Sequence, residues 1–421
     1  MKKHLLYFFF FAMALSSCKK ESTEPIIGDV DERLSEALAS YQDQLSGAEF
    51  GWKGYLLTDN KTPATFLFKF NDKNRTVMAA DYKPTEVESS YRLKALQRPT
   101  LMFDSYSTLH LIADPTSSVF GGETANGYFS DFEFAFLSAN ADTIKLEGTF
   151  NKSKLILIKS KSAEESNAVF TSLQDVSSAV SKLKTYFKRT TIGGINCEVK
   201  LDGNAQTFAV TYLLDGTTPT TVSSNFYVSG KNIALYEPLV IGSTTVSELK
   251  DVNFVANTGM INAVINDGPI QIKEAIEPMN YDKLAAEIFY NRPPNGDYWT
   301  ASSGFTVDGI MDTYGVKRIP NFNYIIFWPK YNPAYSRFGY IVNGGWAPYG
   351  PAPIASFPED GTIKFTSAGS FGTPPASILP IISNTSNNLF LPKGFYVIKT
   401  EDKVYDLVSV SDARSWITIG K

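Results

Sequence analysis

The sequence predicts a mainly β protein with a few helices, built as successive antiparallel meanders, barrel-like or lipocalin-like, each preceded by a helix. Two observations predict this fold class. Many short segments alternate apolar and polar residues, as residues 65–70 do, and turn residues such as Asn71 and Asp72 separate them. Three longer segments instead repeat apolar residues at the 3.6-residue spacing of an amphipathic helix. The hydrophobic share of 43% is enough to fill several cores.

The first predicted helix is followed by the longest series of predicted strands. One apolar stripe marks the helix, formed by Leu34, Ala37, Leu38, Tyr41 and Leu45. Asp29 or Asp31 can cap its start, and Gly47 can end it. The strands are predicted at 51–57, 65–70, 75–81, 90–96, 100–103, 108–113, 131–137, 143–150 and 155–159. Within 108–113, His110 shares a strand face with Thr108 and Ile112, as expected of a structural histidine.

Two further units repeat the order of helix and strands. The second helix is predicted within 163–189, on the stripe Val169, Leu173, Val176, Val180, Leu183 and Phe187, and strands fill 197–276. The third helix is predicted at 280–290, with Leu284, Ile288 and Phe289 on its apolar face, and strands follow to the end. The three units either repeat one structure or are unrelated small β modules. The predicted domains are 31–165, 166–279 and an aromatic-rich 280–421.

The N-terminus carries the pattern of a lipoprotein signal. Lys2 and Lys3 precede an apolar run over 5–15, which is too short to span a membrane as a helix. The next residues, Leu15-Ser16-Ser17-Cys18, resemble the lipobox of bacterial lipoproteins. We therefore expect a signal peptide at 1–17, lipidation of Cys18, a tether at 18–30 and a membrane partner through the lipid anchor. An ordinary signal peptide with a chance cysteine is the alternative.

The residue inventory excludes several functional classes. A net charge of −4 offers no field for nucleic acid, so no nucleic-acid partner is expected. Two His and two Cys, of which Cys18 is assigned to lipid, cannot form a four-ligand zinc site of the common kinds. No nucleotide-binding glycine motif or Gly-x-Ser-x-Gly motif occurs. We therefore expect no metal, no cofactor and no catalytic residue, and we do not expect the protein to be an enzyme. Glycoside hydrolysis is the exception that the residue inventory does not exclude, because it needs only two carboxylates.

One stretch of the sequence resembles a known family. Residues 88–113, the pair Gly121-Gly122 and residues 130–134, together with the lipobox, resemble Bacteroidetes lipoproteins of the domain-of-unknown-function 4302 family. The resemblance extends over most of 30–290. It implies an outer-membrane lipoprotein, often encoded beside SusC/SusD-like importers of glycans or peptides, and it implies no catalytic residue. Whether the protein faces the cell surface or the periplasm stays open.

The charges within this motif have two interpretations. Arg92, Lys94 and Arg98 are placed to pair with Asp131 and Glu133 across neighbouring strands. Such pairs would form either a stabilising charge ladder at a barrel mouth or a rim that binds carboxylates or sugars.

The last third of the chain holds the candidate ligand-binding residues. It contains four of the five Trp, and residues 338–358 and 365–392 carry no charge. Four aromatic residues lie among Pro, Asn and Gly on predicted loops: Tyr331, Tyr335, Trp346 and Tyr349. Flat rings on loops can stack on sugars, and missing charges suit a neutral ligand. The alternative is that these rings plug a barrel end; Tyr324, Ile326 and Trp328 alternate as a core-facing strand.

Together these observations predict an outer-membrane-anchored, non-catalytic binding or accessory component of a nutrient import system. Its expected partners are the membrane, a SusC/SusD-like importer and a glycan or peptide ligand. Two alternatives remain open from the sequence. The first is a carboxylate-dependent glycoside hydrolase, and the second is a structural protein that docks on an importer or on another lipoprotein.

Overall fold

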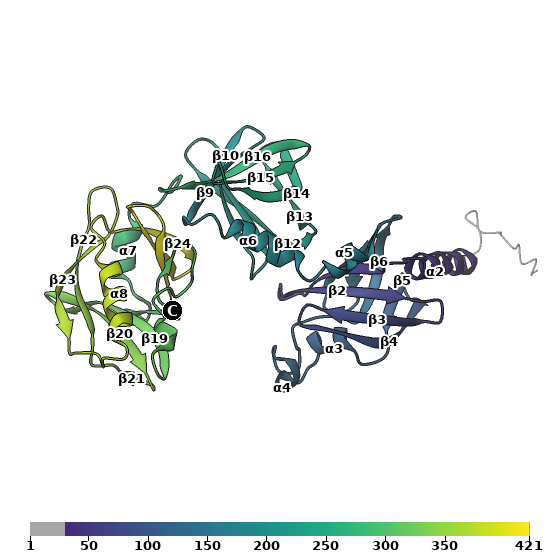
Figure 1. Cartoon of the computed structure of the whole chain (residues 1–421), viewed down its shortest axis with the longest axis horizontal. Coiled ribbons are helices and arrows are strands. Elements are labelled where there is room, and N and C mark those ends of the chain that lie inside the picture. Colours follow the sequence, from purple (N-terminus) through teal and green to yellow (C-terminus); the bar gives the residue numbers. More distant parts are fainter. Residues whose placement is uncertain (1–29, 421) are drawn as a thin grey trace, which may run out of the picture. The chain divides into compact units, whose positions relative to one another are not determined.

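The computed structural model describes residues 30–420 and confirms the predicted fold class (Figure 1). The chain divides between Asn167 and Ala168 into two compact units, here called unit 1 and unit 2. The predicted signal peptide, Cys18 and nearly all of the tether lie outside the described residues. Among the helices of residues 30–420, none has the length and apolar character needed to cross a membrane.

Unit 1 is an eight-stranded closed barrel with its strands in chain order, here called barrel 1. The strands are β1 Trp52–Leu57, β2 Pro63–Phe70, β3 Arg75–Ala80, β4 Lys83–Ala95, β5 Pro99–Phe103, β6 Glu133–Ala139, β7 Thr143–Gly148 and β8 Lys154–Lys159. The helices are α2 Val30–Ser46, α3 Thr108–Ile112, α4 Ser117–Phe120 and α5 Ala163–Asn167. Each strand pairs with the next, and β1 closes the barrel by pairing with β8 at six positions.

Helix α2 packs into the core of barrel 1 and is joined to its first strand. Leu45 is fully buried in that core, and the ring of Tyr41 stacks on Phe136 with centroids 3.9 Å apart. The indole Nε1 of Trp52 donates a hydrogen bond to the carbonyl oxygen of Leu45 at 3.0 Å. This carbonyl belongs to the last turn of α2, where the helix itself offers no donor. The predicted helix is therefore confirmed, with a defined attachment to β1.

The strand predicted at 108–113 is wrong, because these residues form the short helix α3. Leu109 and Ile112, three residues apart, both lie buried in the barrel core, which a strand would not allow. His110 is half-buried, with Nδ1 3.1 Å from Ser107 Oγ and Nε2 3.2 Å from the carbonyl oxygen of Phe103. A helix this short can carry the same alternation of apolar and polar residues as a strand, and this is why the segment was predicted as one. The structural role expected of His110 agrees with its two hydrogen bonds.

The predicted pairing of the motif's basic residues with Asp131 and Glu133 is also wrong. The guanidinium of Arg92 binds both carboxylate oxygens of Asp104, at 2.5 and 2.6 Å. Asp104 is the residue after β5, the strand that pairs with β4. The Arg92 side chain is 55% exposed and that of Asp104 22%, so solvent reaches the pair and its contribution to stability is small.

Asp131 instead holds a turn of barrel 1. It is only 4% exposed, and its carboxylate accepts hydrogen bonds from the backbone N–H groups of Phe150, Asn151 and Ser153 at 2.9–3.1 Å. A side chain on Gly148 would overlap this carboxylate. Asp131 therefore fixes the connection from β7 to β8, rather than forming part of a binding rim.

Unit 2 begins with a helix, which is followed by a second closed barrel of eight strands, here called barrel 2. Its elements are α6 Ser172–Val180, β9 Phe187–Ile192, β10 Ile195–Asp202, β11 Thr207–Leu213, β12 Pro219–Ser229, β13 Asn232–Ile241, β14 Thr244–Val255, β15 Met260–Ile265 and β16 Gly268–Ala275. Val176 of α6 and the following Leu183 are buried in the barrel core. Phe187, predicted on the helix, lies on β9 and packs against Val408 and Ala413.

The third stretch of strands forms smaller sheets. β17 Trp299–Ala301, β19 Phe322–Asn332, β20 Tyr335–Val342 and β21 Gly345–Trp346 make one sheet; β18 Thr306–Val307, β24 Phe395–Glu401, β25 Val404–Ser409 and β26 Ser415–Ile419 make a second; β22 Gly350–Ser356 and β23 Lys364–Phe371 make a ribbon. The helices are α7 Ala285–Asn291 and α8 Leu379–Leu389. The sheets enclose one apolar core, to which α7 and α8 both contribute.

Helix α7 repeats the attachment seen at α2. Phe289 is fully buried, and the indole Nε1 of Trp299 donates to its carbonyl oxygen at 2.9 Å. Leu284, predicted to face the core, is instead 63% exposed and lies just before the helix. Ala285 is buried in its place. The order of helix, turn and first strand is thus shared by the beginnings of barrel 1 and the C-terminal sheets.

Candidate functional site

One face of the sheet that contains β19 and β20 is built of aromatic side chains. Ile325 and Phe327 of β19 point into the core, so the alternate residue Trp328 lies on the opposite face. The sequence prediction, which placed Trp328 on the core face, is therefore wrong by one register position. In β20, Phe338 points into the core and Arg337 lies outward, directly opposite Trp328 in the strand pairing.

The residues on this outer face form a connected cluster, which we call the aromatic surface. It comprises Tyr298, Trp328, Tyr331, Tyr335, Arg337, Trp346 and Phe371. The rings of Trp328 and Trp346 lie 5.6 Å apart, and each also contacts Tyr298. Phe371 reaches the cluster from the end of β23 and meets Tyr335. Four separate strands and a preceding loop residue therefore supply one continuous face.

Arg337 sits at the centre of the aromatic surface. Its guanidinium carbon lies 4.4 Å from the ring centroid of Trp346 and 4.6 Å from that of Phe371. Tyr331 is a third neighbour, at 5.4 Å. Each such cation–π contact contributes about 0.5–1 kcal/mol at a partly exposed site. The cation is therefore held in place by rings on several sides.

The donors of Arg337 are mostly unused. Nη2 donates to the carbonyl oxygen of Ala347 at 3.1 Å, and Nη1 reaches Tyr331 Oη at 3.5 Å. A guanidinium carries five N–H groups. The buried Nε has no acceptor, and no carboxylate within residues 30–420 forms an ion pair with Arg337. Since an unpaired cation in a partly buried place is costly, the group is suited to a ligand that supplies oxygen acceptors.

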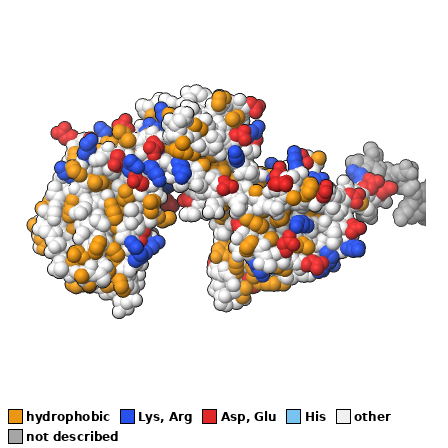
Figure 2. Space-filling view, in the orientation of Figure 1, with side chains coloured by type: hydrophobic (Ala, Val, Ile, Leu, Met, Phe, Trp, Pro, Cys, Tyr) orange, Lys and Arg blue, Asp and Glu red, His pale blue; other side chains and the backbone are white. Residues whose placement is uncertain are grey.

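The aromatic surface is open to solvent at two of its rings. Trp346 is 42% exposed and Tyr331 is 40% exposed, whereas Tyr335 is half-buried. The space-filling view shows mainly uncharged and hydrophobic side chains over β22 and β23, the ribbon that ends in Phe371 (Figure 2). Large exposed rings of this kind are frequent at binding surfaces.

The structure brings together three of the four residues that the sequence singled out. Tyr331, Tyr335 and Trp346 belong to the aromatic surface, on strand ends rather than on the predicted loops. Tyr349 does not: it is 6% exposed and lies in the core, with its ring 6.1 Å from that of Tyr340. Cys18 lies outside the described residues.

Sequence reasoning missed the residue that organises this surface. Arg337 is the single charged residue between Lys330 and Glu359, and that isolation is the signal that could have marked it. Tyr298 and Phe371 lie outside 324–349 in the sequence, and only the folded structure brings Tyr298 to Trp346 and Phe371 to Arg337. Elsewhere in residues 30–420, no group of three or more His, Cys, Asp or Glu side chains could hold a metal ion.

Comparison with known proteins identifies a family and little else. The profile of the family described as Domain of unknown function (DUF4302) matches residues 29–253, more than half of the chain. No curated protein shows significant similarity.

Solved structures resemble the chain only weakly. An octameric penicillin-binding protein homologue from Pyrococcus abyssi is 14% identical, with a TM-score of 0.15, over 34% of this chain and 33% of that one. The Helicobacter pylori beta clamp bound to a DNA ligase peptide is 9% identical, with a TM-score of 0.13, over 92% and 97%. The DNA polymerase sliding clamp from Pseudomonas aeruginosa is 8% identical, with a TM-score of 0.13, over 91% and 97%. TM-scores this low support no inference.

Proposed function

Because the chain belongs to the DUF4302 family, whose description assigns no activity, we propose its function from its own surfaces. We propose that it is a lipid-anchored, non-catalytic glycan-binding component of a nutrient import system, working beside a SusC/SusD-like importer. In this proposal the lipobox at Leu15 to Cys18 supplies the anchor, and the aromatic surface in unit 2 supplies the binding site.

One observation carries the proposal, namely the unpaired guanidinium of Arg337 among exposed rings. Trp346 and Tyr331 offer flat faces on which the C–H side of a sugar ring can stack. Arg337 offers N–H donors to the sugar's oxygens at the edge of those rings. A glycan presents both groups together, since each sugar ring has an apolar face and a rim of hydroxyl groups.

The charge of Arg337 also sets a preference within this class. The sequence alone favoured a neutral ligand, because residues 338–358 carry no charge. Arg337 directly precedes that stretch in the sequence, and its guanidinium places a positive charge within the aromatic surface. A carboxylate accepts charge-assisted hydrogen bonds from a guanidinium that are roughly twice as strong as those of a neutral hydroxyl. We therefore expect glycans that contain a uronate residue to bind more tightly than neutral glycans of equal length.

Binding measurements on the full-length protein test this proposal. The wild type, Trp346→Ala and Arg337→Gln are titrated with uronate oligomers, neutral oligomers and a peptide pool. We expect uronate binding in the wild type and a loss of about tenfold or more in each variant, since each removes a stacking or charged contact. Phe150→Ala is the matched control, because Phe150 is an 86% exposed ring in unit 1.

Three outcomes would count against the proposal. Equal binding by Trp346→Ala and wild type would remove the aromatic surface as the site. Binding of peptides but not of glycans would assign a different ligand class. Cleavage of any bound oligomer by the purified protein would replace the non-catalytic function with hydrolysis.

The anchor is tested separately from the ligand. We expect mass spectrometry to find acyl chains on Cys18 and fractionation to place the protein with the outer membrane. Cys18→Ala should release it, because the acyl chains contribute roughly 0.8 kcal/mol for each buried methylene. An unmodified thiol at Cys18 in a membrane-free protein would contradict this part of the proposal.

A further inference from the structure

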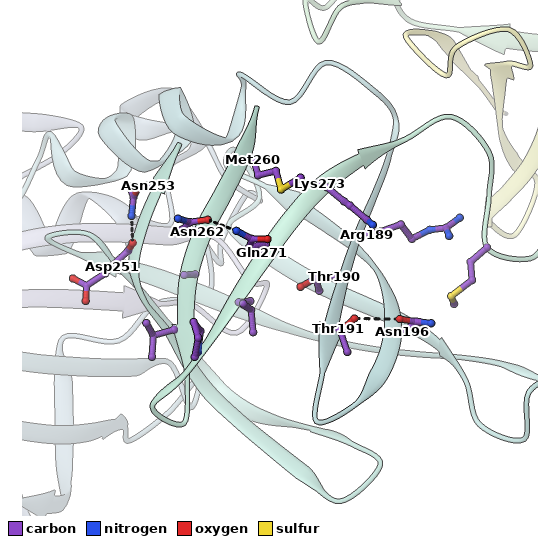
Figure 3. A pocket seen from close by; sticks show the side chains of 15 residues that line it. Arg189, Thr190, Thr191, Asn196, Asp251, Asn253, Met260, Asn262, Gln271 and Lys273 are labelled. Carbon is purple, nitrogen blue, oxygen red and sulfur yellow. Dashed lines mark hydrogen bonds between the residues drawn. The ribbon is translucent and has the colours of Figure 1, made fainter. Parts of the chain in front are cut away.

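Barrel 2 has a split in its wall between β9 and β16. These two strands pair at only three positions, where residues 187–189 of β9 lie antiparallel to residues 273–275 of β16. Beyond that point, Thr190 to Ile192 pair only with β10, and Gly268 to Ile272 pair only with β15. A cleft of about 950 Å³ opens there, bordered by both strands (Figure 3).

A row of uncharged polar side chains crosses the outer wall of this cleft. Asn253, Asn262 and Gln271 occupy successive pairing positions on β14, β15 and β16. Across the split, Thr191 and Asn196 are paired in the same way on β9 and β10. Figure 3 shows the first three side chains in a line toward the split and the other two beyond it. The wall thus presents amide and hydroxyl groups on five adjoining strands.

These groups retain hydrogen-bonding capacity. Gln271 Nε2 donates to Asn262 Oδ1 at 3.4 Å, and Thr191 Oγ1 donates to Asn196 Oδ1 at 3.1 Å. Each amide has two donor hydrogens and an acceptor oxygen with two lone pairs, so most of this capacity is free. The row can therefore both donate to and accept from a ligand.

The floor of the cleft contains a buried hydroxyl without a partner. Thr190 is 6% exposed and lines the cleft, and its Oγ1 has no hydrogen-bond partner among residues 30–420. Ala263 and Ile270, which also belong to the interior side of the wall, line the cleft beside it. A buried hydroxyl is seldom left unpaired in folded proteins. A ligand hydroxyl that enters the split would satisfy it.

The spacing and charge of the cleft select the ligand. Residues opposite each other on paired strands lie about 4.5–5.5 Å apart, whereas an extended peptide repeats on one side every two residues, about 6.6 Å. The amide row therefore fits a chain with hydroxyl groups repeating at the shorter interval better than it fits a peptide. Asp251 and Lys273 line the cleft with opposite charges, and Arg189 is already engaged by Glu198 and by the carbonyl oxygen of Glu277, so the charged groups of the cleft leave no net charge for an anion.

We propose that the β9–β16 cleft is a second binding site, for a neutral oligosaccharide, in which Asn262, Gln271 and Thr190 bind sugar hydroxyl groups. Met260 and Met279 line the cleft and give the apolar contacts that the C–H faces of the sugar need. This site is separate from the aromatic surface, and its existence does not depend on the function proposed for that surface.

Calorimetric titration of the full-length protein with neutral glucose, mannose and xylose oligomers tests the cleft. We expect at least one series to bind, and the double variant Asn262→Leu/Gln271→Met to bind it about tenfold or more weakly, since it removes several hydrogen bonds. Thr221→Val is the matched control: Thr221 is exposed on the same barrel and pairs with Thr211 outside the cleft.

A second variant guards against a merely structural effect. Thr190→Val removes the unpaired hydroxyl while keeping the shape of the side chain. We expect it to raise the melting temperature of the free protein and to weaken oligomer binding. A rise in melting temperature with unchanged affinity would show that Thr190 does not touch the ligand, and would overturn the role assigned to it.

The two sites fail independently. Failure of every neutral oligomer to bind, or equal binding by wild type and the double variant, would overturn the cleft proposal. Binding that is lost in Trp346→Ala and kept in the double variant would also overturn it, while supporting the aromatic surface. If neutral oligomers lose affinity in the double variant and not in Trp346→Ala, the cleft proposal is supported. The aromatic surface is then tested separately by the uronate titration.

Discussion

Tyr349→Ala should destabilise the C-terminal sheets more than Trp346→Ala, although both residues belong to one uncharged segment. Tyr349 is 6% exposed within the core, and removing a buried aromatic side chain costs about 3–5 kcal/mol. Trp346 is 42% exposed, and its ring contacts Arg337, Trp328 and Tyr298. The cation–π contact contributes about 0.5–1 kcal/mol and each of the two ring–ring contacts about 0.5–1.5 kcal/mol, so Trp346→Ala should cost about 1.5–4 kcal/mol in total.

Native-state hydrogen exchange measures both costs in the same strand. The amides of β20 report the opening free energy of the sheets, and each variant should lower it by the amount given above. Glycan affinity should follow the opposite order, with Trp346→Ala the weaker binder at temperatures where both variants are folded. A cost for Tyr349→Ala no greater than that for Trp346→Ala would refute the assignment of one ring to the core and the other to the surface.

Three further changes test barrels 1 and 2. Burial lowers the pKa of His110 below its ordinary value, so the unfolded chain binds a proton more readily and the stability of unit 1 should fall as the pH falls through about 6.5. His110→Gln should flatten that fall in urea titrations at pH 7 and pH 5; an equally steep fall in the variant would contradict this role. Burial lowers the pKa of Lys188 to about 8, against the attraction of Glu274, so unfolding should become harder by roughly 3 kcal/mol as the pH rises from about 8 to the ordinary 10.5. Lys188→Met, compared over that range by chemical denaturation, should lack this rise, and a rise of equal size in the variant would reject it. Gly148→Ala should cost unit 1 about 1–3 kcal/mol or more, because the new methyl group displaces the Asp131 carboxylate from three backbone donors; an unchanged melting temperature would mean that this turn is not held by Asp131.

Alternation and helical spacing were sufficient to predict the β-rich fold, because each barrel buries one face of every strand. Residues 65–70, for example, alternate cleanly and lie within β2. The secondary-structure predictions are wrong where the apolar pattern extends over only a few residues or continues past the end of an element. Residues 108–113 alternate over so few positions that one helical turn satisfies the same spacing, and the burial of both Leu109 and Ile112 decides for the helix. Phe187 continues a helical stripe, yet the chain has already turned into β9.

The candidate site was predictable only in part. Composition indicates an aromatic-rich segment, but it cannot say which ring of a strand faces solvent, since a shift of one residue exchanges the two faces. For this reason Trp328 was placed inward although it lies on the outer face. Tyr349 was predicted on an exposed loop, and composition does not show that this residue packs into the core. The cleft in barrel 2 gave no signal, because it arises from three missing pairs between strands about eighty residues apart.

The bond from Trp52 to the end of α2 has a consequence for the order of folding. It joins residues seven positions apart, whereas the same Trp52 pairs with Lys159 only when the whole barrel has closed. Since the entropy lost in closing a loop grows with its length, we expect the helix and the first strand to form a corner early, around which the remaining strands assemble. Trp299 gives the C-terminal sheets a starting corner of the same kind, ten residues from its partner.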